Sequence, residues 1–329
     1  MSEPNQSKDL IAFSFGEPEA IEPNRWLTDY TELFYDHYAD YWSTPISRQG
    51  LAQIANTNAH HGALIYARRN MVSGRFKGGA GLKRRQMQAF VHDLIQFGDA
   101  AFLKVRNGLG RVVRLHPLPS MYLRRHQSGD FRLLRANNEQ LHYRQEDVIY
   151  LSQYDPRQQI YGLPDYLGGI QSALLNRDAT LFRRRYYQNG AHMGFIFYAT
   201  DPNLSESQEE DLKAKIQSSK GVGNFRSLFI NIPNGNPDGV KLIPVGDIAT
   251  KDDFDRIKNI SAQDVLTAHR FPPGQAGIIP SNAAGLGDPE KTDTVYTRNE
   301  VLPLCELIAD EVNSDPDIPA RLALEFVLE

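Results

Sequence analysis

The sequence has only one cysteine among its 329 residues, Cys305. A lone thiol cannot form a disulfide within the chain, and it excludes a zinc site built from several cysteines. Cys305 lies in an apolar pattern with helical spacing, so we predict a buried thiol that packs as a small apolar side chain. This position favours a packing role over that of a nucleophile.

Long apolar runs are also missing. The longest candidate, 195–199, has the size of a strand, whereas a helix needs about 18 apolar residues to cross a bilayer. The first residues, 1–9, lack a basic segment followed by an apolar one, so no export signal is predicted. We therefore expect no membrane partner.

The common catalytic motifs are absent as well. A glycine cluster at 78–81 suggests a phosphate-binding loop, but no Walker A motif can be written across 74–84. The sequence has no nucleophile elbow and no zinc-protease motif, and its nine histidines are scattered. His60 and His61 are adjacent, whereas two metal ligands on one helix face need a spacing of three or four. We predict no catalytic residue, no metal site and no cofactor.

The charges are mixed in sign. The formal net charge is −4, with 23% charged and 41% apolar residues, values typical of a soluble globular protein. Basic clusters at 83–85, 124–125 and 183–185 contrast with acidic segments at 206–211 and 252–255. A near-neutral total argues against tight electrostatic binding of nucleic acid, although it is compatible with a protein that lets nucleic acid pass.

Helices and a β-rich segment are predicted in the first part of the chain. The aromatic segment 26–42 is expected to be a helix or an irregular segment with a broad apolar face. Amphipathic helices are predicted over 48–73 and 82–97, the second one ended by a glycine at its C′ position. Short alternating segments joined by turn residues predict an antiparallel sheet or a small barrel-like unit over 100–152. The longest helix is expected at 163–189.

The second part is predicted as helices around a hairpin. An exposed polar helix is expected at about 206–218, supported by acidic and basic residues four apart. Two β segments, 227–233 and 240–245, flank a turn and predict a hairpin. Pro303 predicts a kink in a final helix at 292–313.

One stretch, 247–292, combines a helix, a stop and a long loop. A capping-box pattern occurs at 250–253 and again at 261–264, so the helical part is either two short helices or one bent helix. Paired prolines within 271–274 end it. From these residues alone, a surface loop between two helices is the simpler interpretation, and a functional loop is the alternative.

Four short sequences resemble the portal proteins of tailed bacteriophages, in particular the P2-like, PBSX-type branch. They occur in the family's order and span most of the chain: Phe13–Glu19, Tyr161–Gly169, Arg185–Ala191 and His269–Gly274. The resemblance implies an α+β portal-type fold. It further implies a ring of twelve subunits at one capsid vertex, through which double-stranded DNA is packaged and ejected.

The resemblance also implies a division of the chain into the segments of a portal subunit. These are a mixed wing domain at 1–200, a first stem helix at 204–220, a β-hairpin clip at 221–246, a second stem helix at 250–271, a tunnel loop at 272–291, and a kinked helix with a short crown or C-terminal segment at 292–329.

Three sets of residues are candidates for contacts with DNA or with partners. In the tunnel loop, the residues expected to narrow the channel and touch the DNA backbone are Gln275, Ile278, Ile279 and Asn282. In the second stem helix, the residues expected to face the channel are Lys251, Arg256 and Lys258. In the clip, the residues expected to dock the packaging motor are Arg226, Asn234 and Lys241.

The partners and locations that the resemblance implies are those of a virion component. Expected partners are the terminase large subunit, the major capsid and scaffold proteins, and the head-completion or tail connector proteins. The protein is expected at the capsid vertex of the virion, and in the host cytoplasm during assembly.

Two other classes of protein stay open. One is a nucleic-acid-binding enzyme with an unrecognised active site, which would use the basic clusters and the aromatic residues of 26–42. The other is a capsid-associated structural protein without a DNA channel. A purified monomer with nuclease or nucleotidyl activity would favour the first, and rings with a closed centre would favour the second.

Overall fold

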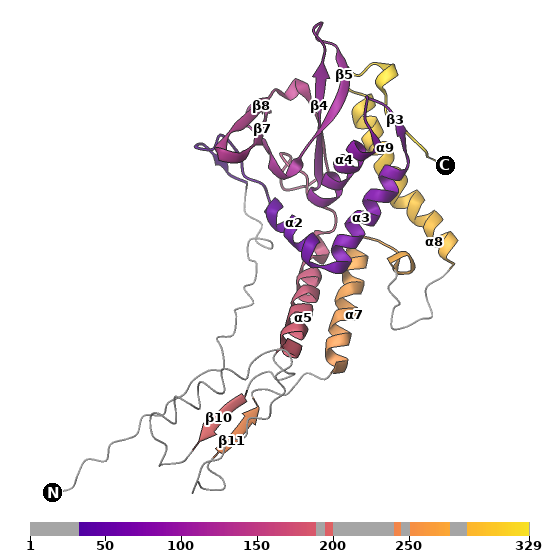
Figure 1. The fold of residues 1–329 in the computed structure, drawn as a ribbon. Coiled ribbons are helices and arrows are strands. Elements are labelled where there is room, and N and C mark those ends of the chain that lie inside the picture. The colour runs from indigo at the N-terminus through magenta and orange to yellow at the C-terminus, as the bar shows by residue number, and fades with distance from the viewer. Residues whose placement is uncertain (1–32, 189–194, 200–239, 245–250, 277–287, 329) are drawn as a thin grey trace, which may run out of the picture. The chain divides into compact units, whose positions relative to one another are not determined.

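The structure is a computed structural model that describes residues 33–188, 195–199, 240–244, 251–276 and 288–328 (Figure 1). The chain divides into two compact units, one formed by 23–177 with 257–329 and the other by 1–22 with 178–256. The boundaries after residues 177 and 256 both fall within helices. The larger unit contains most of the described elements.

Three helices pack together in the larger unit: α2 (Arg48–Thr57), α3 (Ala59–Gly74) and α4 (Arg84–Phe97). The prediction of one helix over 48–73 is wrong at Asn58, which separates α2 from α3. The side-chain oxygen of Asn58 accepts a hydrogen bond from the His61 amide at 2.8 Å, and its amide group donates to the Ala173 carbonyl at 2.8 Å. Asn58 is therefore an N-cap that starts a new helix.

An antiparallel sheet lies next to α4, with strand order β5-β4-β9: β4 (Asp99–Arg106), β5 (Val112–Leu118) and β9 (Val148–Ser152). The strands predicted within 100–152 are confirmed, but they form two three-stranded antiparallel sheets and not one unit. Gly98 ends α4 in the left-handed conformation, with φ 81°. A Cβ atom there would collide with the carbonyl group of Leu163. Glycine therefore lets the chain turn directly from α4 into β4.

A second antiparallel sheet has the order β6-β7-β8: β6 (Leu123–Arg125), β7 (Phe131–Leu134) and β8 (Gln140–Tyr143). The described part of the aromatic segment forms a small hairpin, β1 (Tyr35–Asp36) with β2 (Tyr41–Trp42), so the helical alternative is wrong there. The Asp36 carboxylate accepts hydrogen bonds from the backbone amides of Tyr38 and Ala39, both at 2.9 Å. This side-chain bonding favours a turn over a helix.

The C-terminal helix is irregular, as predicted, and has three parts: α8 (Pro289–Tyr296), a π-helical turn (Thr297–Val301) and α9 (Leu302–Asn313). Pro303 stands in the first turn of α9, where its missing N–H group is tolerated, directly after the π-turn. Beyond α9, the short strand β12 (Glu325–Phe326) pairs with β3 (Phe76–Gly78).

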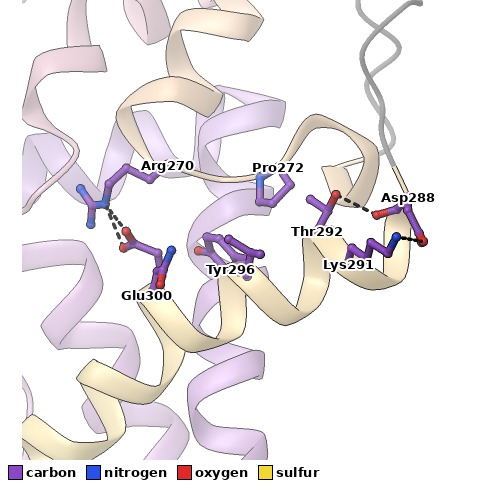
Figure 2. A pocket seen from close by; sticks show the side chains of 9 residues that line it. Arg270, Pro272, Asp288, Lys291, Thr292, Tyr296 and Glu300 are labelled. Carbon is purple, nitrogen blue, oxygen red and sulfur yellow. Dashed lines mark hydrogen bonds and ion pairs between the residues drawn. The ribbon is translucent and has the colours of Figure 1, made fainter.

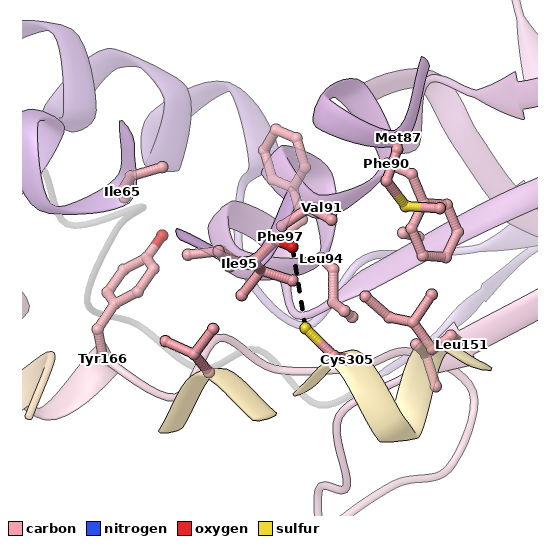
Figure 3. Close-up of a cluster of buried hydrophobic side chains, with 14 of the residues drawn as sticks. Ile65, Met87, Phe90, Val91, Leu94, Ile95, Phe97, Leu151, Tyr166 and Cys305 are labelled. Carbon is pink, nitrogen blue, oxygen red and sulfur yellow. Dashed lines mark hydrogen bonds between the residues drawn. The ribbon is translucent and has the colours of Figure 1, made fainter. Parts of the chain in front are cut away.

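The main core of the larger unit lies between α3, α4, α9 and the first sheet (Figure 3). Phe90 of α4 stacks on Phe102 of β4, with ring centroids 3.8 Å apart. Cys305 is fully buried, and its Sγ lies 3.8 Å from the Val72 carbonyl oxygen. The predicted buried thiol is thus confirmed, and burial raises its pKa to about 11.

Two long helices, α5 (Ile170–Gln188) and α7 (Lys251–Ala268), pack antiparallel where both belong to the larger unit. Ser172 donates a hydrogen bond to Asp264 at 2.9 Å. One turn further along α5, Asn176 donates to the Ser261 hydroxyl at 2.9 Å and to the Lys258 carbonyl at 3.0 Å. These hydrogen bonds accompany apolar packing, since Ile170 and Leu174 of α5 and Leu266 of α7 are buried in the same core.

The helix α7 is continuous over its whole described length, which excludes the two-helix alternative. Ser261 does not act as a second N-cap, because its hydroxyl donates a hydrogen bond back to the Ile257 carbonyl at 2.7 Å. This bond reaches the carbonyl four residues back, as serine side chains inside helices do, and the helix continues through it. The capping pattern at 261–264 was therefore misleading.

In the smaller unit, β10 (Phe195–Ala199) pairs antiparallel with β11 (Val240–Pro244). The strand at 195–199 and the strand at 240–244 were both predicted, but their mutual pairing was not. The other half of the predicted hairpin, 227–233, lies outside the described residues, as do the polar helix 206–218 and the predicted first stem helix 204–220.

Candidate functional site

Two of the four motifs that resemble portal proteins meet at the C-terminal end of α7. The first supplies Asp165 and Tyr166, and the second supplies His269 and Arg270, while Arg68 reaches them from α3. All five residues belong to the larger unit. We call these five residues the junction cluster.

Arg68 and Asp165 form the buried ion pair of the junction cluster. Arg68 is only 2% exposed, and its Nη1 and Nη2 donate to the two carboxylate oxygens of Asp165 at 2.9 and 2.7 Å. Arg270 binds the same carboxylate through Nη2. Burial opposes the ionisation of Asp165, but the two arginines outweigh it and lower its pKa to about 2. Asp165 is therefore ionised at neutral pH.

The buried histidines His61 and His269 are held neutral. Arg68 donates to Nδ1 of His269 at 3.3 Å, so the proton of His269 is on Nε2, which lies 2.9 Å from Nδ1 of His61. Burial lowers the pKa of His61 to about 4. Burial, the adjacent His61 and the Arg68 charge lower the pKa of His269 to about 2. The two rings thus extend the hydrogen-bonded network from α7 into α3.

Tyr166 packs on both histidines and ties the cluster to α4. Its ring stacks on His269 with centroids 4.9 Å apart and meets the edge of His61 at 4.6 Å. The Tyr166 hydroxyl donates to the Gln96 carbonyl at 2.6 Å. Burial raises the pKa of Tyr166 far above its usual range. The tyrosine is therefore a neutral donor that fixes the position of the first motif.

The helix α7 ends in a Schellman motif at Arg270. The amide of Phe271 donates to the Leu266 carbonyl at 2.9 Å, and the amide of Arg270 donates to the Thr267 carbonyl at 2.9 Å. Arg270 has φ 53°, the left-handed conformation that glycine usually takes at this position. This conformation costs other residues roughly 1–2 kcal/mol. Leu266 and Phe271 are both buried, which supplies the apolar contact of the motif.

The side chain of Arg270 also reaches the π-turn between α8 and α9. Its Nε lies 2.8 Å from both carboxylate oxygens of Glu300 (Figure 2). Single π-turns are rare in proteins, and those that occur are often found at functional sites. Arg270, Pro272 and Glu300 line a pocket of about 390 Å³ together with Tyr296 and other residues of α8. Phe271 meets the edge of the Tyr296 ring at 5.0 Å.

Of the predicted tunnel-loop residues, the structure describes Gln275. It lies in a short 3₁₀ segment after α7, and its amide donates to Asp293 of α8 at 2.7 Å. Gln275 is thus attached to α8. Ile278, Ile279 and Asn282 lie outside the described residues.

The predicted stem and clip residues are only partly described. Lys251 is the first residue of α7, Arg256 is exposed, and Lys258 is half-buried. Lys241 lies in β11, while Arg226 and Asn234 lie outside the described residues.

Sequence reasoning missed three residues of this region: His61, Arg68 and Glu300. His61 was interpreted as part of an ordinary adjacent pair. A signal for Arg68 was available, because it stands on the apolar face of α3 four residues after Leu64. A charged residue in an apolar stripe indicates a buried partner. No local pattern pointed to Glu300.

The chemistry of the junction cluster is that of a structural joint. Among the described side chains, no group of three or more His, Cys, Asp or Glu is placed to hold a metal ion. None of the helices in the described ranges is long and apolar enough to cross a bilayer. The cluster consists of ion pairs and neutral rings that join α3, the segment before α5, the end of α7 and the π-turn.

Comparison with known proteins extends the motif-based resemblance to most of the chain. A family model for phage portal proteins matches residues 83–329. A probable portal protein of Haemophilus phage HP1 is 54% identical over 304 residues, which cover 91% of this chain and 88% of the relative. A probable portal protein of Escherichia phage P2 is 40% identical over 302 residues, covering 92% and 87%.

Solved structures share the fold at low sequence identity. A chain in the neck of a native gene transfer agent particle, computed with C12 symmetry, matches with a TM-score of 0.62 and 16% identity, covering 87% of this chain and 85% of its own. An HK97 family phage portal protein from Corynebacterium diphtheriae matches with a TM-score of 0.57 and 17% identity, covering 83% and 93%. The chain belongs to the phage portal protein family.

Proposed function

We propose that twelve copies of this portal protein form a ring at a capsid vertex, through which double-stranded DNA is packaged and later ejected. The observation that carries this proposal is the match of residues 83–329 to the portal family model. The twelvefold symmetry applied to the neck of the gene transfer agent particle, which contains a chain of the same fold, supports the subunit number.

The pairing of α5 with α7 bears on which helices form the stem. We assign the second stem helix to 250–271, as the resemblance implies, and this range includes α7. The described helix that packs antiparallel against α7 is α5, through Ser172 and Asn176. We therefore propose α5 as the first stem helix in place of 204–220. The segment between the two helices then includes the proposed clip, 221–246.

A channel for DNA passage needs a wall that does not hold the duplex. Duplex DNA carries one negative charge per about 1.7 Å of its axis, so a strongly basic wall repeated around a ring would retain DNA. The first turns of α7 combine Lys251, Arg256 and Lys258 with acidic residues at 252, 253 and 255. This balance supports a channel surface that binds the phosphate backbone weakly and reads no sequence.

The proposed partners follow from the place of a portal in a phage head. The clip residues Arg226, Asn234 and Lys241 would dock the terminase large subunit during packaging and the head-completion or tail connector proteins afterwards. The wing would contact the major capsid and scaffold proteins. Assembly would take place in the host cytoplasm, and the finished ring would stay at the capsid vertex of the virion.

The ring is tested by the native mass of the purified protein, followed by negative-stain images of the same sample. We expect a species of about twelve subunits with an open centre, as a channel requires. A monomer that persists across salt and protein concentrations, or a ring with a closed centre, would contradict the proposal.

The tunnel loop is tested by deletion of residues 276–285. We expect rings of unchanged mass but reduced packaging or retention of DNA, because Ile278, Ile279 and Asn282 would no longer narrow the channel. The matched control replaces 276–285 with a glycine-serine segment of equal length, which separates the role of the side chains from that of loop length. Unchanged phage yield after the deletion would count against the tunnel-loop assignment.

A further inference from the structure

We propose that Arg270 is a positioning residue, which fixes the path of the chain as it leaves α7 and so sets where the predicted tunnel loop begins. This inference rests on the proposed channel function and adds to it a residue that acts through its contacts within the subunit. Its basis is the combination of an unusual backbone conformation with three ion-pair contacts of one side chain.

The backbone at Arg270 would be satisfied better by glycine. Its left-handed conformation, with φ 53°, strains every residue type that carries a Cβ atom. The two hydrogen bonds of the Schellman motif use only backbone atoms, so they do not require an arginine. The reason for an arginine at this position must therefore lie in the contacts of its side chain.

The side chain of Arg270 bridges two carboxylates from different parts of the fold. Its Nη2 binds Asp165, which Arg68 already holds in a bidentate pair, and its Nε binds both oxygens of Glu300 at 2.8 Å. The planar guanidinium group suits two such contacts at once, whereas a lysine ammonium group does not. The end of α7 is thus tied to the segment before α5 and to the π-turn.

These contacts fix both arms of the predicted loop. On the leaving arm, Phe271 packs against Tyr296, and Gln275 donates a hydrogen bond to Asp293 of α8. On the returning arm, Asp288 is the N-cap of α8, which continues into the π-turn that carries Glu300. The Arg270–Glu300 pair therefore links the end of α7, where the chain leaves, to the π-turn after α8, the helix to which it returns.

The decisive variant is Arg270→Gly, because it keeps the left-handed turn and removes the side-chain bridge. Relief of the backbone strain acts in the opposite direction, so faster exchange shows that the lost bridge outweighs it. In the purified ring we expect amide hydrogen exchange about tenfold faster over 271–276 and 289–296, a change that corresponds to about 1.4 kcal/mol. Exchange over α4 should not change. Glu300→Gln should act in the same direction. Unchanged exchange over both segments in Arg270→Gly would overturn the proposal.

The matched control is Arg298→Ala, which removes an exposed arginine from the same π-turn and should leave exchange over 271–276 unchanged. DNA retention in packaged heads separates this inference from the proposed function. If deleting 276–285 lowers retention while Arg270→Gly changes neither exchange nor retention, the positioning role is refuted and the channel role stands. If Arg270→Gly speeds exchange but neither variant affects retention, Arg270 positions the segment and the proposed role of the tunnel loop is refuted.

Discussion

Replacing Arg68 with methionine is expected to lower the free energy of unfolding by about 2–3 kcal/mol, less than the loss of a buried partner that leaves an uncompensated charge. Arg68 is 2% exposed and donates to Asp165 and to His269. Methionine fills a similar volume but leaves the half-buried carboxylate of Asp165 with Arg270 alone. The measurement is urea-induced unfolding of the variant and the unchanged protein at neutral pH.

Two further variants show whether the ion pair causes this loss. Arg69→Met changes the next residue, whose guanidinium stacks on the Tyr66 ring at 4.6 Å, and should cost less than about 1 kcal/mol. In the double variant of Arg68→Met with Asp165→Asn, the loss should be smaller than the sum of the two single losses, because the partners are coupled. Additive losses, or a loss for Arg68→Met no larger than that of Arg69→Met, would show that the pair does not stabilise the fold.

Local sequence patterns predicted most of the larger unit because its elements follow local rules. The glycine after 82–97 ends a helix, and the alternating segments of 100–152 form antiparallel strands. The errors occur where a side chain has a distant partner. Asn58 splits a predicted helix because it also bonds to the Ala173 carbonyl, and Ser261 fails as a cap because it lies at the contact between α5 and α7.

The candidate site was predictable as two motifs but not as a cluster. The motifs containing Asp165 and His269 were recognised for their resemblance to portal proteins, yet they are far apart in the sequence, and Arg68, which contacts both, is distant from each. A sequence pattern does not reveal contacts across such separations. Glu300 was not predicted for a different reason: a π-turn has no characteristic local pattern, and Pro303 suggested only a kink.

The second large effect concerns acid pH. His61 and His269 have folded pKa values of about 4 and about 2, whereas an unfolded histidine has a pKa of about 6.5. Between these values the unfolded chain binds more protons, so the stability that each neutral histidine contributes is present above pH 6.5 and is lost as the pH falls. From pH 7 to pH 5, each histidine should lower the free energy of unfolding by about 2 kcal/mol.

A buried carboxyl group opposes this trend, so the histidine contribution must be measured by difference. Burial raises the pKa of Asp93 to about 7, against the hydrogen bond from the Ser120 amide at 2.8 Å, and this favours the folded state as the pH falls.

The stability difference between wild type and His269→Gln should therefore shift by about 2 kcal/mol in favour of the variant from pH 7 to pH 5, and His61→Gln should behave alike. Glutamine can still accept from Arg68 at 269 but does not titrate. His142→Gln, which replaces an exposed histidine, serves as the matched control. Parallel pH profiles for wild type and both buried-site variants would mean that the two histidines are not held neutral, and the tautomers assigned from Arg68 would be wrong.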